Sequence, residues 1–434
     1  MESAKVSLFR KVGFLSVLVG LVVVFLSVYQ NFFSKPYLTI IGVVKMSDGL
    51  GRQSVELIDA LKDEVSIGFV QTSRPSYKDV PASIKRIIKN SYRPLGHVIV
   101  FEECIWSPEK EHYKLLRTPR DDRQIRLAYT MFESSEIPKE WVSILNHYFD
   151  AAVVPDNYFV KVYQNSGVTI PIFVLPLGLN LQPLLKEETK VNPHFPIVFG
   201  NFGACDIRKN QKLLVEAFYE AFGDTPEVIL KINSRYAQED TAKEIQEYIK
   251  KKGIHNVEFT QNCWNNEEYL EAFKTIDCLV AISKGEGFSI QPREAMALGI
   301  PCIVSDNTAQ HTICRTGLVK TVKASLKEPA MRRWGTILKE PVQYGDEYNC
   351  SKEAVVEAFL DVYHNYDTYL AKGEAARQWV RRYDFSEMKP YYLALVKPQE
   401  VTLSTKNKIT PKGICTNSKE LYDKYQRILK KGKG

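Results

Sequence analysis

Short apolar runs alternate with amphipathic stretches along most of the chain. The segment YLTIIGVV (37–44) has no charge and is followed by a Gly-containing turn and the amphipathic SVELIDALKD. The same order recurs with VSIGFVQ, GHVIVFE, DAAVVPD and PIFVLPL. Continuous apolar strands that alternate with helices are typical of a parallel sheet covered on both faces. The pattern therefore predicts an α/β domain over residues 36–180.

Residues 181–196 interrupt this pattern with three prolines and a cluster of charges, which indicates a linker. The alternation of strands and helices then restarts and predicts a second α/β domain over residues 197–380. A return helix (381–396) and a basic tail (397–434) follow. Ligands of open parallel sheets bind beyond the carboxyl ends of the strands, so we expect the site in the crevice between the two domains.

The N-terminus has a different pattern. From Val12 to Ser34 there are 23 residues without a charge, and as a helix they would be about 34 Å long, enough to cross a bilayer core of roughly 30 Å. Residues 1–35 are therefore predicted to be a short stub and a single-pass membrane anchor. A cleaved signal peptide is the alternative, although no small-residue cleavage site follows. The preceding Lys and Arg favour a cytosolic N-terminus, but the membrane side of the body stays open.

The charge is unevenly distributed. The net charge of +7 equals that of residues 397–434, which hold ten Lys and Arg against three Asp and Glu, so the remainder of the chain is neutral. A neutral body argues against a groove for nucleic acid. The tail is expected to be a solvated, partly disordered end, or else a short basic helix. The eight cysteines include no Cys-x-x-Cys pair, which excludes the common redox and zinc motifs.

The segment KGEGFSIQPREAMALGIPCIVSD (284–306) carries the strongest chemical signal. Gly285 and Gly287 allow a ligand to approach the backbone, and a helix predicted to begin near Ser289 presents free amides that favour an anion. Glu286 precedes this helix, and Glu294 lies about one and a half turns into it. Ionised carboxylates accept hydrogen bonds from hydroxyl groups. A ligand with both phosphates and hydroxyls, such as a nucleotide sugar, fits this pattern, and a structural turn with a helix cap is the alternative.

This segment resembles the motif of two glutamates separated by seven residues in glycosyltransferase family 4, retaining enzymes with the two-domain GT-B fold. YTMFESSEIPKEWV (129–142) and SGVTIPIFVLPLGLN (166–180) resemble further parts of that family. The resemblance implies that Glu286 faces the donor sugar and that Glu294 binds the ribose hydroxyls. It also implies that the amides of Phe288 and Ser289, next to Gly287, meet the diphosphate.

Two further loops follow predicted strands. In GNFGACDIRKNQKLLVEAF (200–218), Lys209 begins a helix, where the helix dipole disfavours a cation unless an anion is bound. The resemblance assigns Lys209 to the donor diphosphate, with Arg208 as either a second cation or a solvated side chain. The loop SDGLGRQ (47–53) allows a ligand to approach the backbone closely, although turns use glycine for other reasons too. The family has a similar loop near the donor phosphate and the acceptor, so the resemblance implies this role for Gly49 and Gly51.

The chain also departs from the family pattern. An Arg expected just after the strand near residue 201 is missing, and no His lies between His112 and His147. Glu133 or Glu136 could line the first-domain side of the crevice instead, but either fits a surface position equally well.

The function predicted from these residues is a hexosyl-type retaining glycosyltransferase that uses a nucleotide-sugar donor and a glycan or lipid acceptor. No cofactor and no metal are expected, because helix N-termini and Lys209 can hold the phosphate charge and the chain lacks Asp-x-Asp. Two alternatives remain. One is a catalytically degenerate, membrane-anchored protein that binds nucleotide sugar or glycan, and the other is an epimerase or phosphorylase on the same fold.

Overall fold

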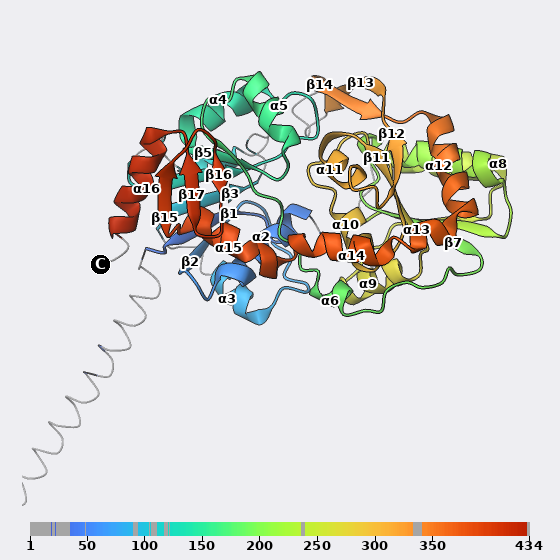
Figure 1. Cartoon of the computed structure of the whole chain (residues 1–434), viewed down its shortest axis with the longest axis horizontal. Coiled ribbons are helices and arrows are strands. Elements are labelled where there is room, and N and C mark those ends of the chain that lie inside the picture. Colours follow the sequence, from blue (N-terminus) through green and yellow to red (C-terminus); the bar gives the residue numbers. More distant parts are fainter. Residues whose placement is uncertain are drawn as a thin grey trace, which may run out of the picture.

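Two six-stranded parallel sheets, each covered by helices, form the two lobes of the molecule in the computed structural model (Figure 1). The structure describes residues 19, 22 and 35–431, apart from 48, 90–93, 104, 106–110, 117–119, 121, 236–238 and 333–340. The predicted anchor thus lies almost wholly outside the described residues.

The first domain has the strand order β2-β1-β3-β4-β5-β6. All residues of β1, β3, β4 and β5 are buried, because helices lie on both faces of the sheet. This explains the uninterrupted apolar runs of the sequence. Its elements are β1 (Leu38–Gly42), α2 (Gly49–Leu61), β2 (Ile67–Gln71), α3 (Ala82–Lys89), β3 (Val98–Glu102), η1 (His112–Leu116), β4 (Ile125–Tyr129), α4 (Lys139–Tyr148), β5 (Ala151–Val154), α5 (Tyr158–Ser166) and β6 (Ile172–Val174).

The second domain has the strand order β12-β11-β10-β7-β8-β9, again with parallel pairs throughout. A core of aromatic and branched side chains, centred on Phe199 and Phe218, fills the space between this sheet and α7 and α12. Its elements are β7 (Ile197–Phe202), η2 (Ile207–Lys209), α7 (Gln211–Phe222), β8 (Val228–Asn233), α8 (Glu239–Lys252), β9 (Val257–Thr260), α9 (Asn266–Lys274), β10 (Cys278–Ala281), α10 (Ile290–Ala297), β11 (Cys302–Asp306), η3 (Thr308–Gln310), α11 (His311–Cys314) and β12 (Lys320–Lys323).

Both sheets reverse their strand order at one point, and this decides where a ligand can bind. In the first domain the reversal lies between β1 and β3, and in the second it lies between β7 and β10. The loops on either side of a reversal diverge to opposite faces and leave a crevice beyond the strand ends. The Gly-rich loop follows β1, whereas the loops with Lys209 and Glu286 follow the neighbouring strands β7 and β10.

The chain crosses between the domains twice. Residues 175–196 lead out of the first domain and include the short α6 (Gln182–Leu185). After α12 (Lys352–His364), α13 (Tyr366–Leu370) and α14 (Gly373–Val380), the chain passes η4 (Arg381–Tyr383) and returns as α15 (Phe385–Val396), which packs on α2 (Figure 1). The two crossings meet, since Leu179 N donates to Tyr383 O (2.8 Å) and Phe385 N donates to Leu179 O (2.9 Å).

A hairpin that the sequence did not predict joins the domains on a second side. Strands β13 (Leu326–Arg332) and β14 (Val342–Asn349) project from the second domain toward the loop after β4. Ser135 N donates to Asp346 O (3.0 Å), and Asp346 N donates to Ser135 Oγ (2.9 Å). Arg332 adds a hydrogen bond to Glu133 O (3.1 Å). The hairpin therefore fixes the loop that carries Glu133 against the second domain.

The basic tail is folded, so the expectation of a solvated end is wrong and the alternative of a short basic helix is confirmed. Strands β15 (Glu400–Leu403), β16 (Lys408–Ile409) and β17 (Gly413–Thr416) form a small sheet, and α16 (Lys419–Lys431) follows it. The side chains of Lys424 and Asp150, 2% and 3% exposed, form an ion pair of 2.7 Å that attaches α16 to the first domain. The sequence suggested a solvated tail because its charge was counted without the partners that the first domain supplies.

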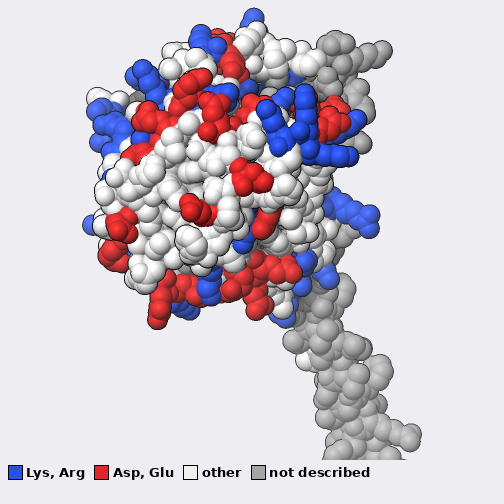
Figure 2. Space-filling model, turned by 90° about the vertical axis from the view of Figure 1, so that its right-hand side faces the viewer, with Lys and Arg blue, Asp and Glu red and all other residues white. Residues whose placement is uncertain are grey.

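Charges of both signs cover the outer end of the second domain. Figure 2 shows Lys and Arg beside Asp and Glu around a broad area of other residues, so the basic residues on this face do not form one continuous field. This distribution agrees with the charge balance of the chain outside residues 397–434.

The prediction of a single-pass membrane protein is contradicted. Across the residues that the structure describes, no helix combines the length and the apolar character that crossing a membrane requires. The longest of these helices, α8, has 14 residues and therefore a length of about 21 Å, against roughly 30 Å of hydrocarbon. It also contains Lys250, Lys251 and Lys252 in its last turn. The assignment of a membrane localisation is corrected accordingly.

The buried Lys424–Asp150 pair yields a stability prediction. Lys424→Met removes one partner of a buried pair and leaves the Asp150 charge uncompensated, which costs about 3–5 kcal/mol. Urea unfolding should show this loss, whereas Lys430→Met, on the exposed side of the same helix, should unfold like the wild type. Equal stabilities of the two variants would contradict the role given to the pair.

Candidate active site

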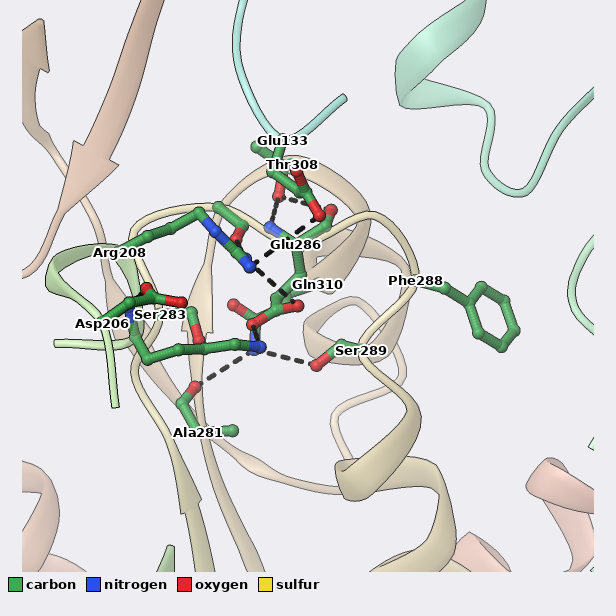
Figure 3. Close-up of polar contacts among 12 residues, drawn as sticks. Glu133, Asp206, Arg208, Ala281, Ser283, Glu286, Phe288, Ser289, Thr308 and Gln310 are labelled. Carbon is green, nitrogen blue, oxygen red and sulfur yellow. Dashed lines mark hydrogen bonds and ion pairs between the residues drawn. The ribbon is translucent and has the colours of Figure 1, made fainter. Parts of the chain in front are cut away.

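The loops after β7 and β10 bring together two cations and the first glutamate of the motif. Lys209 Nζ lies 2.5 Å from Glu286 Oε1, and Arg208 Nη1 lies 3.5 Å from Glu286 Oε2. Arg208 also donates to Gly285 O (2.6 Å) and approaches Glu133 Oε1 of the first domain to 3.9 Å (Figure 3). Arg208 is thus one of the site's cations and not a solvated side chain.

The surroundings of Glu286 hold it ionised. Burial by itself would raise the pKa of the carboxyl group, but the charges of Lys209 and Arg208 and the hydrogen bond from Lys209 lower it to about 2. The ordinary value is 4.5, so the pair stabilises the fold above that pH and this contribution is lost as the pH falls toward 2. At neutral pH the site therefore presents a carboxylate, which accepts hydrogen bonds.

Thr308 fixes the backbone of Glu286. Its hydroxyl accepts a hydrogen bond from Glu286 N (2.8 Å) and donates one to Glu286 O (3.0 Å). Ala309 N also donates to the same carbonyl (3.3 Å). Thr308, two residues after β11, thus holds the peptide groups on both sides of Glu286 in place.

The start of α10 is shaped by a buried arginine that the sequence analysis missed. Arg293 Nη1 donates to Phe288 O and to Ser289 O (3.1 Å), and its guanidinium lies 3.8 Å from the centre of the Phe288 ring. Because C=O and N–H of a trans peptide point in opposite directions, the carbonyl bond at Phe288 turns the amide of Ser289 away from Arg293. Ser289 itself has a left-handed backbone (φ 63°), a strained conformation outside glycine.

Glycines in the loop between β10 and α10 allow the first domain to pack closely against that loop. A Cβ on Gly285 would lie 2.8 Å from Glu133 O, and one on Gly287 would lie 2.3 Å from Met131 Sδ. A side chain at Gly285 would therefore push the backbone of the first domain away, whereas one at Gly287 would displace the Met131 side chain. The side chain of Phe288 points away from the Arg208–Glu286 cluster, toward Tyr383 (Figure 3).

A cavity of about 380 Å³ lies between the domains and contains the cluster. This volume is within the range of pockets for small molecules. Among the described residues, His, Cys, Asp and Glu nowhere form a group of three or more that could hold a metal ion. Several predicted residues line the cavity, namely Gly49, Glu133, Arg208, Lys209, Glu286, Gly287, Phe288 and Ser289.

Glu294, Gly51 and Glu136 occupy other environments. The carboxylate of Glu294 is only 2% exposed and lies behind the cavity wall, where Arg52 Nη2 (2.6 Å) and the Tyr269 hydroxyl (2.6 Å) contact its two oxygens. Gly51 lies in α2 and packs on the backbone of Lys45, since a Cβ there would be 2.5 Å from Lys45 N, so this close approach explains the glycine. Glu136 is exposed outside the cavity.

Most of the missed residues carry little signal in the sequence. Arg52 and Tyr269 belong to different domains, and only the fold brings them to Glu294. Arg293 did have a recognisable signal, because a charged residue in an otherwise apolar stretch calls for an internal partner. Thr308 lies just beyond the carboxyl end of β11, at the edge of the sheet where the site was expected, so it could have been predicted as a site residue.

Comparison with known proteins finds a family match within the second domain. Residues 186–324 match the family model described as Glycosyl transferases group 1, and this segment contains Lys209, Glu286 and Glu294. This segment is therefore similar to group 1 glycosyltransferases. The uncharacterized glycosyltransferase 335 of Sulfolobus islandicus rod-shaped virus 1 is 28% identical over 204 residues, which are 41% of this chain and 54% of that protein. Uncharacterized protein 356 of the same virus is 19% identical over 320 residues, 68% of this chain and 82% of its own.

Solved glycosyltransferase structures share the two-domain arrangement. A glycosyltransferase from Rickettsia africae ESF-5 has a TM-score of 0.59 at 14% identity over 84% of this chain and 98% of its own. Anabaena Alr3699/HepE, solved in complex with UDP and glucose, has a TM-score of 0.57 at 11% identity over 82% of this chain and 97% of its own. These structures confirm the GT-B-like fold. The family match over residues 186–324 and the similarity to glycosyltransferase 335 carry the assignment as a glycosyltransferase. Placement in family 4 within group 1 stays a prediction.

The close approach of Gly285 to the first domain can be tested. Gly285→Ala forces the Glu133 backbone to move, and overpacking of this kind typically costs about 1–3 kcal/mol. Gly203 lines the same cavity, but a Cβ there would meet its nearest atom, Gln291 Oε1, at an ordinary 3.7 Å. Thermal unfolding should therefore show a lower Tm for Gly285→Ala and an unchanged Tm for Gly203→Ala. A stable Gly285→Ala would mean that the domains do not pack as described.

Proposed function

We propose that this glycosyltransferase transfers a hexosyl group from a nucleotide-sugar donor to a hydroxyl of a glycan or lipid-linked acceptor, with retention of the anomeric configuration. The observation that carries the proposal is the Lys209–Glu286–Arg208 cluster in the interdomain cavity. The complex of HepE with UDP and glucose makes UDP-sugars the first donors to test. The resemblance to retaining family 4 enzymes supports retention.

Departure of the nucleoside diphosphate is the step that most needs stabilisation. Negative charge develops on the leaving phosphate while the sugar becomes an oxocarbenium-like cation. Lys209 has three N–H donors, so it can keep its contact with Glu286 and also donate to a phosphate oxygen. Arg208 and the start of α10 supply further positive potential on the same side of the cavity. Preorganised donors of this kind are usually the largest contribution to catalysis.

Glu286 is assigned to the sugar. Its carboxylate is ionised and lines the cavity, so it can accept a hydrogen bond from a donor hydroxyl and offset positive charge on the ring. Glu133 enters the same cavity from the first domain and is the best placed carboxylate for contact with an acceptor hydroxyl. The contact between the domains at Gly285 would limit competition by water.

Substitution of Lys209 tests this assignment. Lys209→Met removes a donor to the leaving group and should lower kcat by about 10²–10³-fold in a UDP-sugar transfer assay. Lys212→Met is the matched control, because Lys212 lies on α7 and contacts Glu244 at the surface. Glu286→Gln should likewise abolish most transfer while leaving UDP binding measurable. Binding of donors without transfer or hydrolysis by the wild type would favour the alternative of a catalytically degenerate binding protein.

The absence of a metal requirement is part of the proposal. Two cations already face the expected leaving group, so transfer should proceed at an unchanged rate in excess EDTA. Activity is to be measured before and after chelation and after addition of Mg²⁺ or Mn²⁺. Loss of activity in EDTA that a divalent ion restores would show that the protein cations are insufficient.

A further inference from the structure

Protein groups contact both carboxylate oxygens of the second glutamate of the motif. One carboxylate oxygen of Glu294 lies 2.6 Å from Arg52 Nη2, and the other accepts a hydrogen bond of 2.6 Å from the Tyr269 hydroxyl. Glu294 does not line the cavity, whereas Arg52 and Tyr269 do. In this arrangement a ligand in the cavity meets Arg52 and Tyr269 first, because the Glu294 carboxylate, only 2% exposed, lies behind them.

The two partners of Glu294 differ in origin. Tyr269 lies on α9 of the same domain, whereas Arg52 lies in the first turn of α2 in the other domain. Arg52 also has a second carboxylate on its own helix, since its Nε lies 2.8 Å from Glu56 Oε1. Separation of the domains would therefore remove Arg52 from Glu294 but leave Arg52 paired with Glu56.

We propose that Arg52 controls access to a hydroxyl-binding site at Glu294 and that the ribose of the donor nucleotide displaces it. This inference rests on the proposed function, because it takes the ligand to be a nucleoside diphosphate sugar. The resting ion pair closes the crevice across α2 and α10, and it must open before ribose hydroxyls reach Glu294 Oε1. Arg52 is thus a residue that sets donor affinity and not a catalytic residue.

The expected change in nucleotide affinity follows from competition between Arg52 and the ribose for Glu294 Oε1. When only a fraction of the molecules has the site open, the apparent dissociation constant is the intrinsic value divided by that fraction. If the Arg52–Glu294 pair keeps about nine molecules in ten closed, removing it tightens ribose-dependent binding about tenfold. Glu56 acts in the opposite direction, because it stabilises Arg52 in the open state.

The experiment measures UDP, GDP, ADP and inorganic pyrophosphate binding by calorimetry. Arg52→Gln should bind the preferred nucleoside diphosphate about tenfold more tightly than the wild type. Pyrophosphate has no ribose, so its affinity should be the same in both. Glu56→Gln should weaken nucleotide binding without changing pyrophosphate binding, which provides a second test of opposite sign. Arg86→Gln, an exposed arginine on α3, is the control for loss of a charge.

The outcomes distinguish a failure of the role given to Arg52 from a failure of the proposed function. The role of Arg52 is overturned if Arg52→Gln binds the nucleotide no more tightly than the wild type does. It is also overturned if the affinity for pyrophosphate rises as much as that for the nucleotide. The proposed function stands in both cases. If Arg52→Gln does not fold, the role of Arg52 is overturned when Glu56→Gln binds the nucleotide as tightly as the wild type or more tightly. A wild-type protein that binds none of the three nucleotides overturns the proposed function and the inference with it.

Discussion

The ion pair between Lys209 and Glu286 is the contact on which the rest of the site depends. It joins loops from β7 and β10, two strands that are neighbours only because the sheet reverses its order between them. Each residue alone would be a charge in a largely closed cavity, which is costly. Lys209 and Glu286 neutralise each other, and Arg208 lies beside them at the place where a ligand can enter. Thr308 and Asp206 then hold the backbones of Glu286 and Lys209 in position.

The first domain completes this site through backbone contacts as much as through side chains. Glu133 O lies against Gly285, Met131 lies against Gly287, and the β13–β14 hairpin holds the intervening loop. The glycines thus serve the fit between domains in addition to any ligand. A change in the relative position of the domains would alter the environment of Glu286 and of Glu294 at once, because both lie on the loop and helix that face the first domain.

The fold and half of the site could be predicted because their determinants are local. Uninterrupted apolar strands required a sheet covered on both faces, and parallel topology then brought the loops of Lys209 and Glu286 to one edge. The surroundings of Glu294 were not predictable, since Arg52 lies 242 residues away in another domain. The tail was misjudged for the same reason, because Asp150 neutralises Lys424 only in the folded chain. The predicted membrane protein, by contrast, rested on the length of one uncharged run, residues 12–34, and the helices of the described chain do not support it.

Charge balance gives a reason for the arrangement of the side chains in the cavity. Arg208 and Lys209 face Glu286 and Glu133, so two cations meet two carboxylates and the cluster is neutral at rest. A neutral cluster avoids the cost of unpaired charge in a closed cavity when no ligand is present. A diphosphate that enters adds negative charge without removing either cation, because both have N–H groups beyond those used by the carboxylates. The carboxylates then remain available for hydroxyl groups, so one cluster can serve both the phosphate and the sugar of a nucleotide sugar.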